Sequence, residues 1–86
     1  MNDNQKKVYE LFESFKHTSN YKDSAIMEIM GNREKFENNL NEMWAAVPRI
    51  GMSQMMEYRK AVEHLKSVGL KVMRNQAGDH KIVHKN

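Results

Sequence analysis

GLKVMRNQAGDHKIVHK, residues 69–85, is the stretch that decides the fold. Two runs rich in valine, isoleucine and lysine flank the polar segment NQAG at residues 75–78. Apolar residues before Gly69 recur at the helical period of 3.6, whereas those after it follow the strand period of 2. Gly69 suits the end of a helix because it adopts left-handed backbone conformations without steric cost. The stretch therefore predicts a β-hairpin directly behind a helix.

The pairing of the two strands depends on the length of the loop between them. If residues 75–78 form a four-residue loop, Arg74 lies opposite Asp79, and the further pairs are Met73 with His80, Val72 with Lys81, Lys71 with Ile82 and Leu70 with Val83. One face then carries Leu70, Val72 and Val83. The other carries Lys71, Met73, His80, Ile82 and His84 and is free to meet solvent or a partner. A shift of one residue would exchange the two faces.

A two-stranded hairpin is marginal by itself, so it needs helices on which to dock. Four helical patterns precede it. The first covers residues 4–16, where Val8, Leu11, Phe12 and Phe15 form one apolar stripe. The second is short, with Asp23 or Ser24 as its N-terminal cap and Gly31 in a left-handed conformation after it. We expect the third to begin after Asn32 and to stop at Pro48, and the fourth to run from Ser53 to about Val68.

The third helix shows the clearest division between an apolar and a polar side. Its apolar stripe consists of Phe36, Leu40, Met43, Trp44 and Val47. Polar residues lie mainly off that stripe, namely Glu34, Glu37, Asn38, Asn41 and Glu42. We expect Trp44 to be the largest side chain of the core.

Length and composition favour one small domain spanning residues 1–86, because a chain of 86 residues cannot divide its buried surface between two cores. The chain has no cysteine, which excludes a disulfide framework, a thiolate nucleophile and cysteine-ligated zinc. No apolar run approaches the roughly 18 residues that span a bilayer, so we expect a cytoplasmic protein without membrane contact. The predicted fold class is mostly α with a small C-terminal β-hairpin (α+β), built from about four helices.

Charge is distributed unevenly along the chain. Residues 1–48 carry six basic and eight acidic side chains, whereas residues 49–86 carry eight basic and three acidic ones. The basic half contains the last helix and the hairpin. A concentrated positive surface favours a polyanionic partner.

The last helix and hairpin, with Leu65 placed before Val68-Gly69-Leu70 and a basic hairpin after them, resemble the recognition helix and wing of winged-helix proteins. The resemblance covers about 50 residues and implies a winged-helix-like fold and a nucleic-acid-binding regulatory protein, with duplex DNA as the expected partner. It implies helix contacts from Arg59, Lys60 and Lys66, and phosphate contacts of the wing from Lys71, Arg74, Lys81 and Lys85. The segment PRIGM departs from the family as a longer turn between the two helices. The last helix also lacks a cluster of Asn, Gln and Arg, which leaves base selectivity to Gln54, Arg59 or Lys60.

A second resemblance concerns LKSVGLKVMRNQAGDHKIVH, which is similar to the opening of HicA-type toxins, small ribonucleases with a fold like that of double-stranded-RNA-binding domains. Arg74, Gly78 and His80 fall near that family's arginine and Gly-Ser-His-His motif, in which histidine is catalytic. Asp79 replaces the serine, the loop is one residue longer, and no third strand or final helix follows. We therefore expect no enzymatic activity and interpret His80 as a polar strand residue.

His80 and His84 are four residues apart in a strand and so share a face, where two imidazoles could begin a metal site. Zinc usually takes three or four ligands, and no spacing elsewhere in the chain requires a third to converge. No nucleotide-binding glycine motif occurs either. We expect neither a metal nor a cofactor.

The alternative function is binding to a host or other partner protein, as an inhibitor or accessory factor of the phage or mobile-element type. The acidic outer side of the third helix and the eight methionines could provide such a surface. Homodimerisation is compatible with either function.

Overall fold

The computed structural model describes residues 3–17, 22–50 and 52–85, apart from the side chains at positions 4, 48–50, 53 and 54. Four helices precede two strands in the order α1 (Asp3–Lys16), α2 (Lys22–Gly31), α3 (Arg33–Ile50), α4 (Met52–Ser67), β1 (Leu70–Arg74) and β2 (His80–His84). The strands form an antiparallel two-stranded sheet. The predicted fold class, mostly helical with a C-terminal hairpin, is confirmed.

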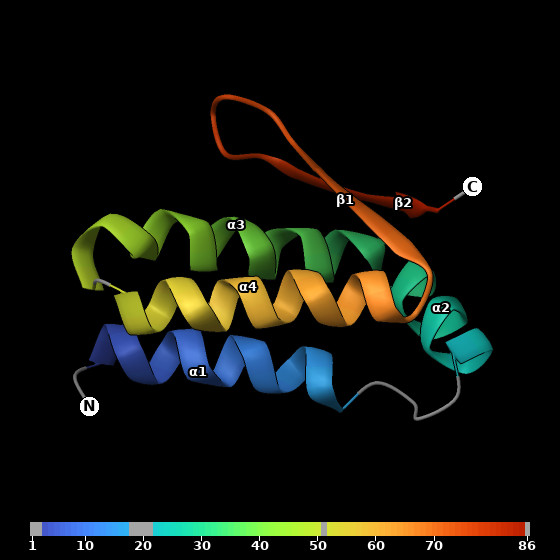
Figure 1. Cartoon of the computed structure of the whole chain (residues 1–86), viewed down its shortest axis with the longest axis horizontal. Helices are drawn as coiled ribbons and strands as arrows, with labels where there is room; N and C mark the ends of the chain where they lie inside the picture. The colour runs from blue at the N-terminus through green and yellow to red at the C-terminus, as the bar shows by residue number, and fades with distance from the viewer. Residues whose placement is uncertain (1–2, 18–21, 51, 86) are drawn as a thin grey trace.

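Helices α1, α3 and α4 form a bundle in which each contacts the other two. Helices α1 and α4 run in the same direction and α3 runs against them, while the short α2 lies at one end (Figure 1). The hairpin lies across this bundle, with β2 contacting α3 and β1 contacting α4. The sheet thus covers the two helices that come directly before it in the chain.

All six elements contribute to one hydrophobic cluster. The predicted stripe of α1 is confirmed, since Val8, Phe12 and Phe15 are buried and Leu11 packs against them. The rings of Phe15 and Phe36 lie 5.1 Å apart and join α1 to α3. Burying each such side chain contributes about 1.5–3 kcal/mol to the free energy of folding. Apolar residues at helical spacing are therefore buried together only when the segment is a helix.

The end of α3 differs from the prediction. The helix continues through Pro48 to Ile50, and only position 51 separates it from α4. Proline fixes φ near the helical value, so the turn continues through it, although it removes the hydrogen bond to the carbonyl four residues earlier and its ring crowds that carbonyl. The segment PRIGM is therefore largely helical, and the longer turn expected there was wrong.

The predicted ends of α2 also need correction. The helix begins at Lys22, so Asp23 and Ser24 lie inside its first turn instead of capping it. Gly31 is helical, and among the described residues only Gly69 and Gly78 have positive φ. Asn32 does precede α3, but its side-chain Nδ2 donates to the Glu28 carbonyl and so completes α2.

The hairpin register is one residue away from the predicted one. Arg74 lies opposite His80, Met73 opposite Lys81, Val72 opposite Ile82, Lys71 opposite Val83 and Leu70 opposite His84. The N–H of Asn75 donates to the Asp79 carbonyl at 3.1 Å, which leaves a loop of three residues ending in Gly78 with φ of 90°. Three-residue loops with glycine in the left-handed region are a standard hairpin connection. Because Asn75 and Asp79 also pair, each residue of β2 lies on the opposite face of the sheet from the one predicted.

Candidate nucleic-acid interface

The inner face of the hairpin, which packs on the helices, carries Leu70, Val72, Arg74, His80 and Ile82. Leu70 and Ile82 are fully buried, and Val72 packs against the core. The exchange of faces in β2 places His80 and Ile82 here, so their predicted exposure was wrong. The outer face carries Lys71, Met73, Lys81 and Val83.

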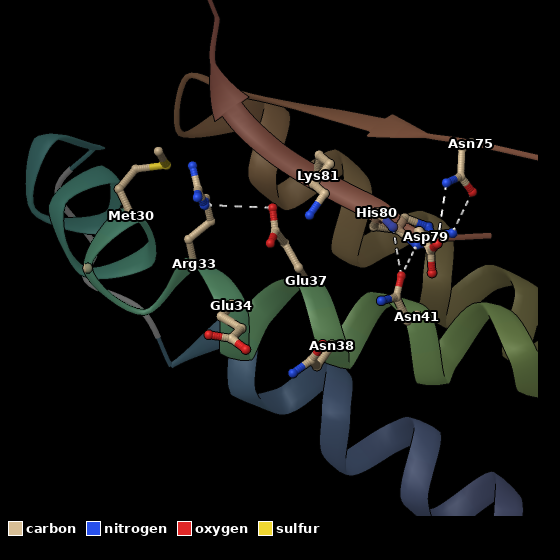
Figure 2. Close-up of a pocket in the computed structure, with 11 residues that line it drawn as sticks. Met30, Arg33, Glu34, Glu37, Asn38, Asn41, Asn75, Asp79, His80 and Lys81 are labelled. Atoms are coloured by element: carbon tan, nitrogen blue, oxygen red, sulfur yellow. Dashed lines mark hydrogen bonds and ion pairs between the residues drawn. The ribbon is translucent and has the colours of Figure 1, made fainter. Parts of the chain in front are cut away.

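Two side chains of α3 bind the edge of β2 that points away from β1. The His80 N–H donates to Asn41 Oδ1 at 2.7 Å (Figure 2). The Ile82 N–H donates to Glu37 Oε2 at 2.9 Å. Arg33 Nε lies 3.8 Å from the same carboxylate oxygen, which keeps a positive group beside the mostly buried Glu37. Side chains of α3 therefore accept the outward N–H groups of β2, as the carbonyl groups of a neighbouring strand would.

His80 is bonded to the protein through both ring nitrogens. Nδ1 lies 2.8 Å from Asn41 Oδ1, and Nε2 lies 2.8 Å from the Tyr58 hydroxyl. Since the amide oxygen only accepts, Nδ1 carries the proton, and Tyr58 donates to Nε2 of the neutral ring. Burial lowers the pKa of His80, and Arg74 lowers it further, while a backbone hydrogen bond at Gly78 and the Asp79 carboxylate raise it. With 1% of its surface exposed, this imidazole has a structural role.

Trp44 lies where the hairpin tip meets α3. The guanidinium carbon of Arg74 is 3.6 Å from the centroid of the Trp44 ring, a stacked cation–π contact. Tyr58 packs against the same indole with ring centroids 5.3 Å apart. Gly78 approaches so closely that an added Cβ would lie 2.7 Å from Trp44 Cδ1. Trp44 is thus half-buried beneath the hairpin, at the border of the core in which it was expected.

The predicted wing residues are all exposed. Lys71 and Lys81 lie at outer-face positions of the hairpin, but the Lys81 side chain also lines the groove between α3 and β2, and Lys85 follows β2. Within residues 3–17, 22–50 and 52–85, none of these three lysines forms a salt bridge with a carboxylate. Arg74 is also exposed but lies on the inner side against Trp44.

The three predicted helix contacts are exposed on α4, where acidic neighbours partly neutralise them. Lys60 Nζ lies 3.2 Å from Glu57 and 6.0 Å from the Phe12 ring centroid, so it lies on the side of α4 that packs against α1. Lys66 Nζ lies 3.7 Å from Glu63. Arg59 lines a shallow groove with Tyr58, Val62 and Glu63. The side chain of Gln54 lies outside the described part of the chain.

A polar groove of about 590 Å³ separates the start of α3 from β2 (Figure 2). Its basic lining residues are Arg33 and Lys81, and its acidic ones are Glu34, Glu37 and Asp79. Because the acidic groups would repel phosphates, this groove is not suited to a nucleic-acid backbone. Among the described residues no group of three or more His, Cys, Asp or Glu side chains is placed to hold a metal ion. His84 is exposed, while His80 lies in the core.

Comparison with family models, with curated proteins and with solved structures returns no match to this chain. Within the described part, no helix has the length and apolar character that crossing a membrane requires. A function for the site is therefore inferred from its own residues and their contacts.

The buried polar cluster of Glu37, Asn41, Tyr58 and His80 was missed by sequence reasoning. Glu37 and Asn41 were expected on the polar side of the third helix, yet Glu37 is 7% exposed. One signal was present: the two residues are four apart and each directly follows an apolar core residue, Phe36 and Leu40. A polar pair at helical spacing beside the core stripe is placed to bind a neighbouring element.

Proposed function

We propose that this protein is a nucleic-acid-binding regulator acting in the cytoplasm, with duplex DNA as the preferred partner and the hairpin as the main contact surface. The observation that carries the proposal is the basic hairpin, where Lys71, Lys81 and Lys85 are exposed and none of the three forms a salt bridge with a carboxylate of the described residues, although Lys81 lies in the same groove as Glu34 and Glu37. Binding to phosphates releases condensed counterions and therefore gains free energy from each such lysine.

Arg74 supports the same surface in a different way. Its stack on Trp44 holds the guanidinium in one place at the hairpin tip, which reduces the entropy lost when it contacts a phosphate. The hairpin would then act as a wing that contacts the DNA backbone, in keeping with the winged-helix resemblance. Helix α4 makes a secondary contribution, because Lys60 and Lys66 already have carboxylate neighbours.

The test measures binding to a labelled DNA duplex by fluorescence anisotropy over a range of salt concentrations. Replacing Lys71, Lys81 and Lys85 together with glutamine is expected to weaken binding and to flatten the plot of log affinity against log salt by about 0.9 for each lost phosphate contact. Labelled RNA and single-stranded DNA serve as competing partners.

A matched control removes the same charge elsewhere. Lys6, Lys22 and Lys35 are exposed on α1, α2 and α3, so their triple glutamine variant has the same net charge as the hairpin variant. The proposal requires this control to bind nearly as well as the unaltered protein. Equal losses of affinity in the two variants would show that DNA is attracted by the net charge of the protein and not by a defined interface.

The second candidate is a protein-binding inhibitor or accessory factor. Large apolar side chains remain exposed, with exposed fractions of 75% for Met27, 79% for Met52, 56% for Met56 and 52% for Met73. Flexible methionines suit adaptable protein contacts. This candidate is favoured if duplex binding disappears near physiological salt. A partner protein whose binding is lost on replacing Met52 and Met56 with serine, but survives the hairpin lysine variant, would establish it.

A further inference from the structure

A hollow of about 230 Å³ lies near the tip of the hairpin, beside the polar groove. Its lining residues are all exposed and all belong to the hairpin, namely Met73, Arg74, Asn75, Asp79 and Lys81. Two cationic side chains and one carboxylate therefore meet around a space that a single group can enter. Lysines that bind phosphates do not account for the carboxylate among them.

Arg74 brings a guanidinium that is held in place but not neutralised. Its central carbon lies 3.6 Å from the centroid of the Trp44 ring, and it forms no salt bridge with any described carboxylate. Because stacking on an aromatic ring uses a face of the planar guanidinium, the N–H groups at its edge stay free. They form a rigid fork that binds two neighbouring acceptors at once.

The Asp79 carboxylate is held by the residue across the loop. The Asp79 N–H donates to Asn75 Oδ1 at 3.0 Å, and Asn75 Nδ2 donates to Asp79 Oδ2 at 3.3 Å (Figure 2). No described residue donates a hydrogen bond to the other carboxylate oxygen. A carboxylate repels phosphates but accepts hydrogen bonds from amino groups. Its place beside Arg74 therefore suits the edge of a base better than the sugar–phosphate backbone.

We propose that the tip of the hairpin enters the major groove of duplex DNA and recognises one G·C base pair. Arg74 donates to O6 and N7 of the guanine, and Asp79 accepts from the N4 amino group of the cytosine. The inference rests on the proposed function and adds a preference for sequence to it. A two-stranded β-ribbon is narrow enough for the major groove, which is about 12 Å wide.

The order of hydrogen-bonding groups distinguishes G·C from A·T. In the major groove a G·C pair presents two neighbouring acceptors, guanine N7 and O6, followed by the cytosine N4 donor. The two donors of Arg74 followed by the acceptor of Asp79 are complementary to this order. An A·T pair has its one donor between its two acceptors, so the guanidinium fork loses one of its bonds in either orientation. Discrimination thus comes from the two side chains acting on one base pair.

The remaining basic residues of the hairpin have a different role. Lys71, Lys81 and Lys85 contact phosphates, which positions the protein on the duplex without reading sequence. Lysine is a point charge without a planar fork, so none of them can replace Arg74. Loss of Arg74 should therefore reduce the preference for sequence, whereas loss of the lysines should weaken binding to every sequence.

The test selects bound duplexes from a pool with a randomised central segment and sequences them. The unaltered protein is expected to enrich G·C at one position or more. Arg74→Lys keeps the charge but removes the fork, so this variant should bind the pool nearly as well and show little enrichment. Arg33→Lys, on α3, makes the same exchange outside the hairpin and should enrich G·C as the unaltered protein does.

The outcomes separate this inference from the proposed function. Lysine-dependent binding to the pool without enrichment of G·C overturns the inference and leaves the proposed function in place. Absence of binding to any duplex overturns both. Equal enrichment by the Arg74→Lys variant and by the unaltered protein places base recognition elsewhere and overturns the inference.

A second measurement leaves the protein unaltered and changes the DNA. A duplex carrying the enriched sequence is prepared with 7-deazaguanine, which lacks the N7 acceptor but still pairs with cytosine. The affinity of the unaltered protein should fall severalfold, because the guanidinium fork then makes one bond in place of two. An affinity equal to that for the guanine duplex overturns the assignment of Arg74.

Discussion

The Nε2 atom of His80 lies 2.8 Å from the hydroxyl oxygen of Tyr58, so that a hairpin strand and α4 share a hydrogen bond inside the core. Tyr58 is 9% exposed and His80 is 1% exposed, which means that water cannot readily replace either partner. The bond ties residues 22 positions apart in the chain.

Replacing Tyr58 with phenylalanine should leave His80 Nε2 buried without a donor. We expect the free energy of unfolding to fall by about 1–3 kcal/mol, the usual cost of an unsatisfied buried polar group. Urea denaturation measures it, with Tyr9→Phe as a control, because the Tyr9 side chain is 46% exposed. An equal effect of the two substitutions would argue against a buried hydrogen bond at His80.

Stability should decrease as the solution is acidified through the histidine range. Burial lowers the pKa of both His80 and His64 from the ordinary value of 6.5, so the unfolded chain takes up protons before the folded protein does. The stability is fully present above pH 6.5 and is lost as the pH falls from there toward the folded pKa values. Thermal unfolding at about pH 7.5 and about pH 5.5 measures the difference. The His80→Asn variant should show a smaller one, and an unchanged pH dependence would contradict a buried neutral His80.

Glu37 should protect the backbone of β2. In Glu37→Ala the Ile82 N–H loses its acceptor, and we expect a loss of about 1–3 kcal/mol together with faster hydrogen exchange at that amide. Glu37→Gln keeps an acceptor oxygen and should retain most of the protection, whereas Glu34→Ala on the exposed side should change little. Slow exchange of the Ile82 amide in the alanine variant would refute this role of the carboxylate.

Two glycine substitutions should have opposite effects. At Gly78, alanine meets both a φ of 90° and a contact of 2.7 Å with Trp44, so we expect a loss of about 1–3 kcal/mol. At Gly31, in helix α2, an added Cβ has no neighbour within 4 Å, and alanine should raise stability by about 0.5–1 kcal/mol. Thermal unfolding of the two variants checks the prediction, which fails if both shift in the same direction.

Local sequence patterns predicted most of the helices because the relevant information lies within a few residues. The stripe of Val8, Phe12 and Phe15 and the change of period at Gly69 are examples. Pro48 misled the prediction, since a proline that removes one hydrogen bond and weakens a helix locally does not always end it.

The face of β2 could not be obtained in the same way. Its register depends on the left-handed conformation of Gly78, which sets a three-residue loop, and on acceptors in α3 that lie 39 and 45 residues earlier in the chain. Alternation fits either face of a strand equally well, and the loop at Gly78 together with the positions of Asn41 and Glu37 distinguishes them. The exposure of the basic residues was easier to predict, because lysine and arginine are rarely buried.

Trp44 gives the molecule an internal optical reporter. It is the single tryptophan of the chain, and Arg74, Gly78 and Tyr58 all lie against its ring. If the hairpin lifts from the bundle while the helices stay folded, the indole becomes hydrated and its fluorescence emission moves to longer wavelength, yet the helical circular dichroism is preserved. The two spectra together therefore distinguish loss of the hairpin from unfolding of the whole protein in every variant above.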